Sequence, residues 1–383
     1  SKEPVRLADS SKNEKWILYT FFALFIWQAI TLLYTDNIES GLKNLEGKLS
    51  LIVLPLILCD LKIPLTRLHN LVKYYVYSLL VCTIFLLAQS VQHLFQFGSF
   101  LTYHNFTRSL DFHAVFYSYY TYLSILFVFM LFNKMNLKKY EQVLFIVSLV
   151  FSFVALIISA SKNVIVVSVL SMIMVFAVRI LRNKLKHREV VIAIIVVACS
   201  GVVISQIPSI KNRYLELGKL DGMDNLAKID SGQKLEHEDR IKFNGTSLRI
   251  VLWSIGLDKV VEEGRVFLGL TPGDRRDIMN EEFYSNGLNP AYENYNLHNQ
   301  YVQTFVEMGL VGLLIYLLLN FLYFKSALST QNYPLLMFMV AFTIFQMTES
   351  VLERNKGIVF FVFFVLFLQK LTLQGNEDRD IRN

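Results

Sequence analysis

The chain has 383 residues, of which 54% are hydrophobic and only 18% are charged, and its mean hydropathy is +0.43. A soluble domain of this length needs more charge on its surface, so the composition excludes an ordinary soluble protein and indicates a membrane protein. The net charge of +6 does not indicate nucleic-acid binding, because the basic residues fall in short loops between apolar runs, where membrane orientation places them.

Ten apolar runs follow one another along the chain. They cover roughly residues 16–34, 48–60, 71–91, 113–133, 141–159, 163–181, 189–207, 308–325, 334–348 and 357–371. Only helices and closed barrels satisfy their backbone hydrogen bonds inside lipid. The runs are continuous rather than alternating, which favours helices of about 20 residues over a barrel. The sequence therefore predicts an all-α polytopic membrane protein with about ten transmembrane helices.

Lysine and arginine are concentrated in alternate connections between these runs. They are dense at 1–15, 61–73, 134–140, 179–188 and in the C-terminal tail, and sparse in the short connections between these segments. The positive-inside rule places the dense set in the cytoplasm and the sparse set outside. In a bacterial inner membrane, both termini are then cytoplasmic and the external side is the periplasm. The chain divides into an N-terminal bundle (1–207), a large external loop (208–297), and C-terminal helices with a cytoplasmic tail (298–383).

The large loop is the exception among otherwise short connections, and a connection that long is usually functional or disordered. Its stretch 247–261 has the apolar spacing of a helix, whereas 219–245 is polar. Arg249 opens this helical stretch and Trp253 follows one turn later. An arginine beside an aromatic residue on a membrane-surface helix can donate two hydrogen bonds to a phosphate. The same pair also serves as an ordinary interfacial anchor.

Polar residues near the external ends of the apolar runs form the candidate site. They are Arg108, His113, Lys162, Arg249, His298, Glu349 and Arg354. Charge close to lipid is expensive, and a mainly cationic set suits a ligand with concentrated negative charge, such as a lipid diphosphate. For any one of these residues, a side chain that snorkels from a helix end to water is the alternative explanation.

His298 lies where the large loop re-enters the membrane. An imidazole there titrates near neutral pH and can take a proton from an attacking hydroxyl; a hydrogen-bonded histidine at the interface is the alternative. Further along, Gly309 and Gly312 predict close helix packing. Glu307 is expected to pack or to pair with a cation rather than to catalyse.

Motifs for bound cofactors are missing from the sequence. It carries no Walker loop, dinucleotide fingerprint or zinc motif. Cys59, Cys82 and Cys199 fall inside apolar runs and lack metal-ligand spacing. We therefore expect neither a cofactor nor a metal.

Two segments resemble the signature of the O-antigen ligase and Wzy-type polymerase superfamily. They are TSLRIVLWSIGLDKVVEEGRVFLGLTPGD, from Thr246, and NLHNQYVQTFVEMGLVGLLIYL, from Asn296. In that pattern an Arg and a Trp begin a periplasmic helix, a glycine-containing turn follows, and a His-Asn pair leads into a Gly-x-x-Gly helix. The closing segment ESVLERNKGIVFFVFFVLF resembles the last external turn and helix of this group. The resemblance covers most of 110–370, and its most specific part is the His-Asn pair.

The resemblance implies a GT-C-like membrane glycosyltransferase that takes a glycan from undecaprenyl diphosphate on the periplasmic face and passes it to an acceptor hydroxyl. The family's essential Arg and His map onto Arg249 and His298. A second essential Arg, in a Ser-Arg-Gly turn, falls on Lys162, which keeps the charge but loses the bidentate fork. Because the family has about twelve spans and the chain starts at Ser1 without a Met, we expect two further helices upstream in a longer chain.

The implied roles follow from these matches. His298 and Arg249 are predicted to be catalytic; Arg249, Lys162, Arg108 and Arg354 to bind the diphosphate; and His113, Trp253, Asn299 and Glu349 to support them. The expected partners are the lipid-linked glycan donor, an acceptor such as lipid A–core, another glycan or a protein, and membrane lipids, but no nucleic acid. Cations on the diphosphate would make a metal unnecessary.

Other functions share part of this pattern. Polymerisation of repeat units and protein O-glycosylation would use the same candidate site residues with other acceptors. Transfer to lipid A–core is favoured over both. A lipid or polysaccharide transporter would carry charges near the middle of its spans, whereas the runs in this chain are almost free of charge.

Overall fold

The computed structural model describes residues 3–61, 63–132, 135–159, 161–181 and 243–380, with a few residues between 191 and 210. The described residues form helices and turns, without a strand among them. They group into two compact units. Unit 1 comprises Ser1–Leu61, Gly218–Asn332 and Phe345–Gln369, and unit 2 comprises Lys62–Leu217, Tyr333–Ile344 and Lys370–Asn383.

The predicted apolar runs are helical wherever the structure describes them. They form α1 (Glu3–Thr31), α3 (Ser50–Asp60), α4 (Leu65–Phe97), α6 (Ala114–Leu131), α7 (Lys139–Ile158), α8 (Lys162–Leu181), α14 (Gln300–Ser329), α15 (Tyr333–Gln346) and α16 (Asn355–Asp380). The run at 189–207 lies almost entirely outside the described residues.

Five helices of the described part are long and apolar enough to cross a membrane. They are Glu14–Tyr34, Leu65–Phe97, Ala114–Leu131, Lys139–Ile158 and Gln300–Ser329, and Lys162–Ile173 and Tyr333–Gln346 are shorter apolar helices. The prediction of an all-α polytopic membrane protein is thereby confirmed.

Shorter helices lie between the long ones. They are α2 (Ile38–Gly47), α5 (His104–Thr107), α12 (Gly245–Glu262), α13 (Arg275–Ser285) and the 3₁₀ turns η1 (Leu32–Tyr34), η2 (Arg108–Leu110), η4 (Pro290–Tyr292) and η5 (Val351–Glu353). α12 begins at Gly245 because the side chain of Asn244 caps it. The Asn244 side chain accepts hydrogen bonds from the N–H groups of Thr246 and Ser247, which have no partner within the helix. The helix expected at 247–261 is therefore present. Most of the large loop before residue 243 lies outside the described residues.

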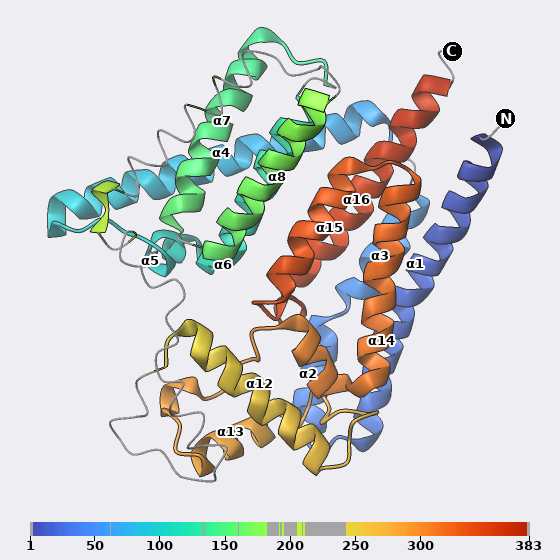
Figure 1. Ribbon diagram of the computed structural model, residues 1–383, viewed down its shortest axis with the longest axis vertical. Helices are drawn as coiled ribbons and strands as arrows, with labels where there is room; N and C mark the ends of the chain where they lie inside the picture. The colour runs from blue at the N-terminus through green and yellow to red at the C-terminus, as the bar shows by residue number, and fades with distance from the viewer. Residues whose placement is uncertain are drawn as a thin grey trace. The chain divides into compact units, whose positions relative to one another are not determined.

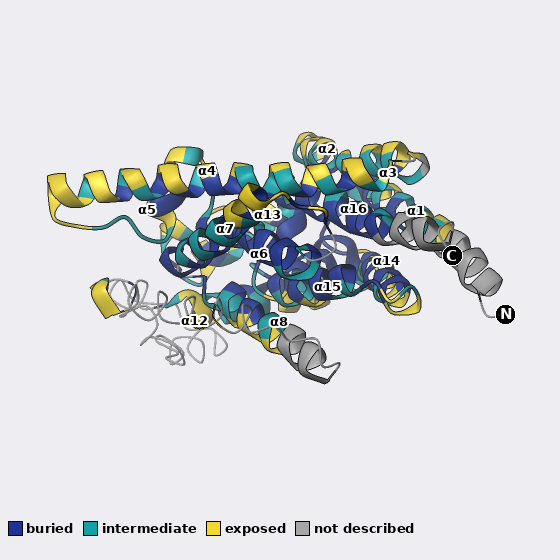
Figure 2. Cartoon of the chain, turned by 90° about the horizontal axis from the view of Figure 1, so that it is seen from above, coloured by how far each residue is buried: buried dark blue, intermediate teal, exposed yellow. Residues whose placement is uncertain are grey.

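Unit 2 is built around α6, which is buried along nearly its whole length (Figure 2). By contrast, α4 buries one face, through residues spaced three and four apart such as Val72, Val76 and Leu79. Its other face exposes large apolar side chains, including Tyr74 and Phe85. Water would disfavour that face, so it is suited to contact lipid.

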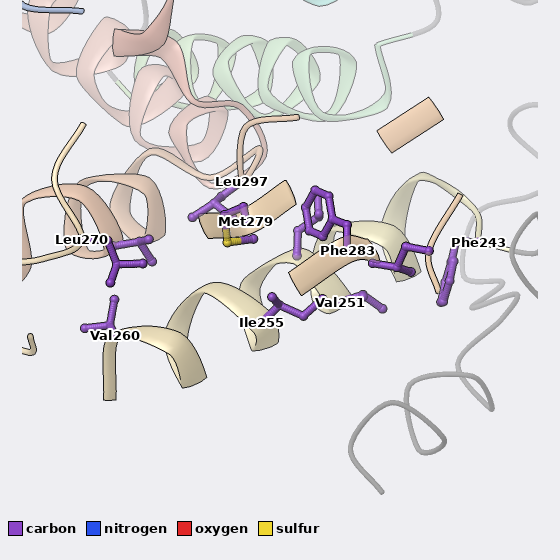
Figure 3. Packing of buried hydrophobic residues seen from close by; sticks show 11 residues of the cluster. Phe243, Val251, Ile255, Val260, Leu270, Met279, Phe283 and Leu297 are labelled. Atoms are coloured by element: carbon purple, nitrogen blue, oxygen red, sulfur yellow. The ribbon is translucent and has the colours of Figure 1, made fainter. Parts of the chain in front are cut away.

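In unit 1, α1 and α14 lie side by side, and α3 packs against α1. Figure 1 shows α2, α12 and α13 gathered at one end of the α1–α14 pair. A separate hydrophobic cluster joins α12, α13 and the start of α14 (Figure 3). It includes Val251, Ile255, Val260, Leu270, Met279, Phe283, Leu297 and Val306. The described part of the large loop therefore has its own core.

A kink divides α14 at Gly309, whose φ of 65° and ψ of −169° are essentially restricted to glycine. The segment 265–271 runs along the kink. The N–H of Leu270 donates to the carbonyl of Val306 and the N–H of Leu310 donates to that of Val266, each over 2.8 Å. A Cβ at residue 309 would lie 2.2 Å from the carbonyl oxygen of Phe267. Close packing at this glycine is confirmed, although its partner is a loop segment rather than a helix.

α14 starts earlier than its apolar run, at Gln300 rather than at 308. The first two turns are polar, but Gln300, Gln303 and Glu307 are buried. They bond to neighbouring loops within unit 1, so these turns form without lipid contact. Hydropathy alone does not register such turns.

Gly309→Ala is expected to lower the free energy of unfolding by about 3 kcal/mol or more, since the strained conformation costs about 1–3 kcal/mol and the Cβ meets a fixed carbonyl. Thermal unfolding in detergent measures the loss. The matched control is Gly264→Ala, where φ is 63° but a Cβ would meet nothing within 4 Å. Equal losses in the two variants would show that close packing at the kink contributes nothing.

Candidate functional site

Three of the predicted site residues meet in unit 1. Oε1 of Glu349 lies 3.3 Å from Nη2 of Arg249, and Oε2 of Glu349 lies 3.2 Å from Nδ1 of His298. The Glu349 side chain is 7% exposed, whereas those of Arg249 and His298 are 27% and 22% exposed. One buried carboxylate thus holds a guanidinium and an imidazole that remain accessible to a ligand. We call these residues the site triad.

Arg249 is fixed in the second turn of α12. Its Nε donates to the carbonyl of Thr348 over 3.2 Å and its Nη1 to the carbonyl of Gly245 over 2.6 Å. With the contact to Glu349, one hydrogen of each guanidinium nitrogen is used. A guanidinium carries five N–H donors, so donors remain for an anionic ligand.

His298 adopts a left-handed backbone conformation, with φ of 46°. Such a φ is uncommon outside glycine, and histidine is among the residues that tolerate it. The side-chain oxygen of Asn296 accepts a hydrogen bond from the N–H of His298 over 2.9 Å. The indole N–H of Trp253 donates to the carbonyl of Leu297 over 2.6 Å. Trp253 therefore positions the residue that precedes His298, rather than standing alone at the surface.

The contact with Glu349 fixes the imidazole tautomer of His298. A carboxylate accepts hydrogen bonds, so Nδ1 of the neutral ring carries the proton. Nε2 then holds the lone pair. An imidazole oriented in this way by a buried carboxylate is suited to accept a proton from a hydroxyl group.

Glutamines of α14 tie the segments of the site together. The Gln303 side-chain oxygen accepts from the N–H of Leu297 over 2.9 Å, and that of Gln300 accepts from the N–H of Leu352 over 2.6 Å. Asn299 is buried and caps α14, because its side-chain oxygen accepts from two N–H groups of the first turn. The predicted supporting residue Asn299 thus supports the site by fixing the backbone at the start of α14. The two glutamines were missed because they look like ordinary helix residues.

A buried network of four charges lies in the same unit as the site triad. Nζ of Lys48 lies 2.9 Å from Glu353 and 3.7 Å from Glu307, and Arg275 lies 3.2 Å from Glu307 and 3.7 Å from Glu353. Two cations face two carboxylates, so the charge is balanced. The prediction that Glu307 pairs with a cation is confirmed. Three members of the network were missed because each looks in the sequence like an ordinary charged residue in a loop. They are Lys48, Arg275 and Glu353.

The charges in this network shift each other's pKa. Burial lowers the pKa of Lys48, but the carboxylates of Glu353 and Glu307 more than offset it, so the pKa lies above its ordinary value. Burial raises the pKa of Glu353, but the charges of Lys48 and Arg275 hold it below its ordinary value. Lys48 and Glu353 are therefore held in their charged forms.

Another buried carboxylate, that of Asp274, fixes the turn after α1. Asp274 accepts hydrogen bonds from the N–H groups of Asp36 and Asn37 and from the hydroxyls of Thr35 and Thr271. Although burial raises its pKa, these bonds bring the pKa of Asp274 below its ordinary value. This carboxylate therefore joins the loop before α13 to the turn that leads into α2.

The remaining predicted site residues lie elsewhere. Arg354 is exposed, directly before α16 in unit 1. In unit 2, Arg108 is exposed in η2 and Lys162 is half-buried as the first residue of α8. His113 precedes α6, and its ring centroid lies 4.2 Å from that of His104. Among the described residues, no group of three or more His, Cys, Asp or Glu side chains is placed to hold a metal ion.

Comparison with known proteins supports the interpretation of the sequence motifs. No curated protein matches the chain. A family model described as O-antigen ligase matches residues 147–317, a stretch that contains Lys162, Arg249 and His298. Enzymes of this family are membrane glycosyltransferases and include ligases and polymerases. The resemblance found in the sequence is thereby confirmed, and the chain is a multi-pass membrane protein whose residues 147–317 match the O-antigen ligase family model.

Proposed function

We propose that this protein transfers a glycan from undecaprenyl diphosphate to an acceptor hydroxyl on the periplasmic face of the inner membrane, with lipid A–core as the acceptor. The observation that carries the proposal is the site triad, in which Glu349 holds Arg249 and His298 within hydrogen-bond distance while both stay accessible. A cation and an oriented imidazole are the groups that this transfer requires.

In the proposed reaction, the acceptor oxygen attacks the anomeric carbon of the glycan. The bond from that carbon to the diphosphate oxygen breaks, and undecaprenyl diphosphate leaves with one more negative charge. Arg249 stabilises the charge as it grows, so it favours the transition state over the ground state. Nε2 of His298 accepts the proton of the acceptor hydroxyl.

Further cations are proposed to assist at the diphosphate. Lys162 opens α8, where its ammonium group adds to the partial positive charge of the helix N-terminus; both favour an anion. Arg108 and Arg354 are exposed and lie, like Lys162, in connections that the positive-inside rule assigns to the periplasm. His113 is proposed to support Arg108 from the start of α6.

Reconstitution with a lipid-diphosphate-linked glycan and candidate acceptors tests the proposal, with release of undecaprenyl diphosphate as the readout. Arg249→Ala is expected to lower the transfer rate about 10²-fold or more, as loss of a charge-stabilising donor does. Arg249→Lys should recover only part of the transfer rate, because an ammonium group cannot donate two parallel hydrogen bonds as a guanidinium does. The matched control is Lys259→Ala, which removes a cation from the same helix that pairs with Glu262, Glu263 and Glu282. Full transfer by Arg249→Ala, or an equal loss in the control, would refute the assignment.

The acceptor is tested in a strain that lacks the protein. Ligation to lipid A–core predicts loss of all capped lipopolysaccharide in that strain. A cap of a single repeat unit would instead show a polymerase, and normal lipopolysaccharide with unglycosylated proteins would show a protein glycosyltransferase.

A further inference from the structure

A pocket of about 320 Å³ opens beside the buried charge network, and none of the three residues of the site triad lines it. It lies between α2, α13 and the start of α16. Its polar lining includes Ser40, Lys43, Asn44, Lys48, Arg276 and Asn355. The volume falls at the lower end of ligand pockets, which span about 300–1,000 Å³. We call it the basic pocket.

The charge of the basic pocket is positive. Its only carboxylate among the described lining residues belongs to Glu353, which already faces Lys48 and Arg275. Lys43 and Arg276 are exposed at the pocket, and neither has an acidic partner at ion-pair distance in the described part of the chain. Two cations are therefore available for an anionic ligand.

The neutral lining suits hydroxyl groups. Ser40 and Asn355 offer a hydroxyl and an amide. The Asn44 side-chain oxygen accepts a hydrogen bond from Gln28 over 2.7 Å, so the orientation of its amide is fixed and its NH₂ group is a donor. The apolar lining is small, consisting of Leu352 and Ile358. A polyhydroxylated ligand fits this surface better than a prenyl chain.

One cation of the pocket lining is held in place by ion pairs. The Lys48 side chain is 5% exposed and is held by two carboxylates. This side chain therefore does not need to be ordered when a ligand binds, which lowers the entropic cost of binding.

One short segment connects the basic pocket to the site triad. Leu352 and Glu353 line the pocket, and Glu349 of the triad lies three residues before Leu352. The N–H of Leu352 donates to Gln300 over 2.6 Å, two residues after His298. A sugar held in the pocket would thus be attached to the same structural elements that orient the proposed base.

We propose that the basic pocket binds a sugar carrying a phosphate or carboxylate group on the acceptor glycan, which positions the acceptor hydroxyl for attack. This inference rests on the proposed function, because it assigns the acceptor side of that reaction. Lys43 and Arg276 bind the anionic group, and the amide and hydroxyl groups bind the sugar ring.

Saturation-transfer NMR on the full chain in phosphatidylcholine nanodiscs tests binding without catalysis. The probes are glucose 6-phosphate, glucuronate and glucose. We expect a signal from at least one anionic sugar and none from glucose, and at least a tenfold weaker affinity in the Lys43→Ala/Arg276→Ala variant. Both side chains are exposed, so this variant should fold. Lys259→Ala is the matched control.

Other results would overturn the inference. No signal from either anionic sugar, or an unchanged signal in the double variant, would exclude the site. Displacement of the sugar by an equal concentration of inorganic phosphate would show a phosphate site, and loss of the signal in phosphatidylglycerol nanodiscs would show a lipid headgroup site.

The transfer assay separates this inference from the proposed function. In the double variant, KM for the anionic acceptor should rise about tenfold or more, with kcat and KM for the donor unchanged. Arg249→Ala should lose transfer but keep the NMR signal. A wild-type protein that binds anionic sugar in the pocket but transfers nothing would contradict the proposed function alone.

Discussion

His298→Asn is expected to lower the rate of glycan transfer by about 10²–10⁴-fold, the usual contribution of a positioned general base. Asparagine keeps a donor that can reach Glu349 and tolerates the left-handed φ of 46° at this position. It cannot accept the proton of the acceptor hydroxyl. The loss should therefore appear in the rate and not in the stability.

Thermal unfolding in detergent separates loss of the base from loss of folding. The unfolding midpoint of His298→Asn should equal that of the wild type. An undiminished rate in His298→Asn, with normal membrane insertion, would exclude His298 as the base.

Glu349 is a positioning residue in the same test. Glutamine at this place retains a hydrogen-bond acceptor but not the charge, so it supports the imidazolium ion less well. The transfer rate of Glu349→Gln should fall while its unfolding midpoint stays at the wild-type value, a combination that loss of packing alone would not produce. An unchanged transfer rate would show that Glu349 only fills space.

Lys48→Met is expected to lower the free energy of unfolding by about 3–5 kcal/mol, the usual cost of removing one partner from a buried charge pair. Arg275 would then face Glu307 and Glu353 alone, at 3.2 and 3.7 Å. Chemical denaturation in detergent measures the loss. The double variant Lys48→Met/Glu353→Gln restores charge balance and should recover part of the stability. No recovery would mean that the methylene packing of Lys48, rather than its charge, stabilises the site.

The pH dependence of stability follows from the same network. Glu353 has a pKa below its ordinary 4.5 in the folded chain, so its stabilisation is present above about pH 4.5 and is lost as the pH falls through the lower folded pKa. Lys48 has a pKa above its ordinary 10.5. Its stabilisation is present below about pH 10.5 and is lost as the pH rises through the higher folded pKa. In Lys48→Met, the free energy of unfolding should depend less on pH in both the acid and the alkaline range.

Hydropathy was sufficient to predict the long helices that the structure describes, because a continuous apolar run in lipid has almost no alternative to an α-helix. Helix ends were less predictable. α4 runs from Leu65 to Phe97, beyond the predicted 71–91, because its polar ends continue the helix without adding hydrophobicity. The polar start of α14 was missed for the same reason.

The candidate site was predictable only in part. Arg249, His298 and Glu349 could be selected because charge near a span end is costly and therefore informative. Their contact could not be predicted, since Arg249 and Glu349 are 100 residues apart. Lys48 and Arg275 gave no signal, because nothing in the sequence around them shows that either cation is buried against a distant carboxylate.

Unit 1 is formed by three separate stretches of the chain, which limits how the large loop can be exchanged. The unit is assembled from 1–61, 218–332 and 345–369, and the charge network joins all three stretches through Lys48, Glu307 and Glu353. An excised loop would leave behind the groups that neutralise Arg275 and orient His298. We therefore expect that exchanging the large loop alone would lower the stability of unit 1, because buried charges would lose their partners.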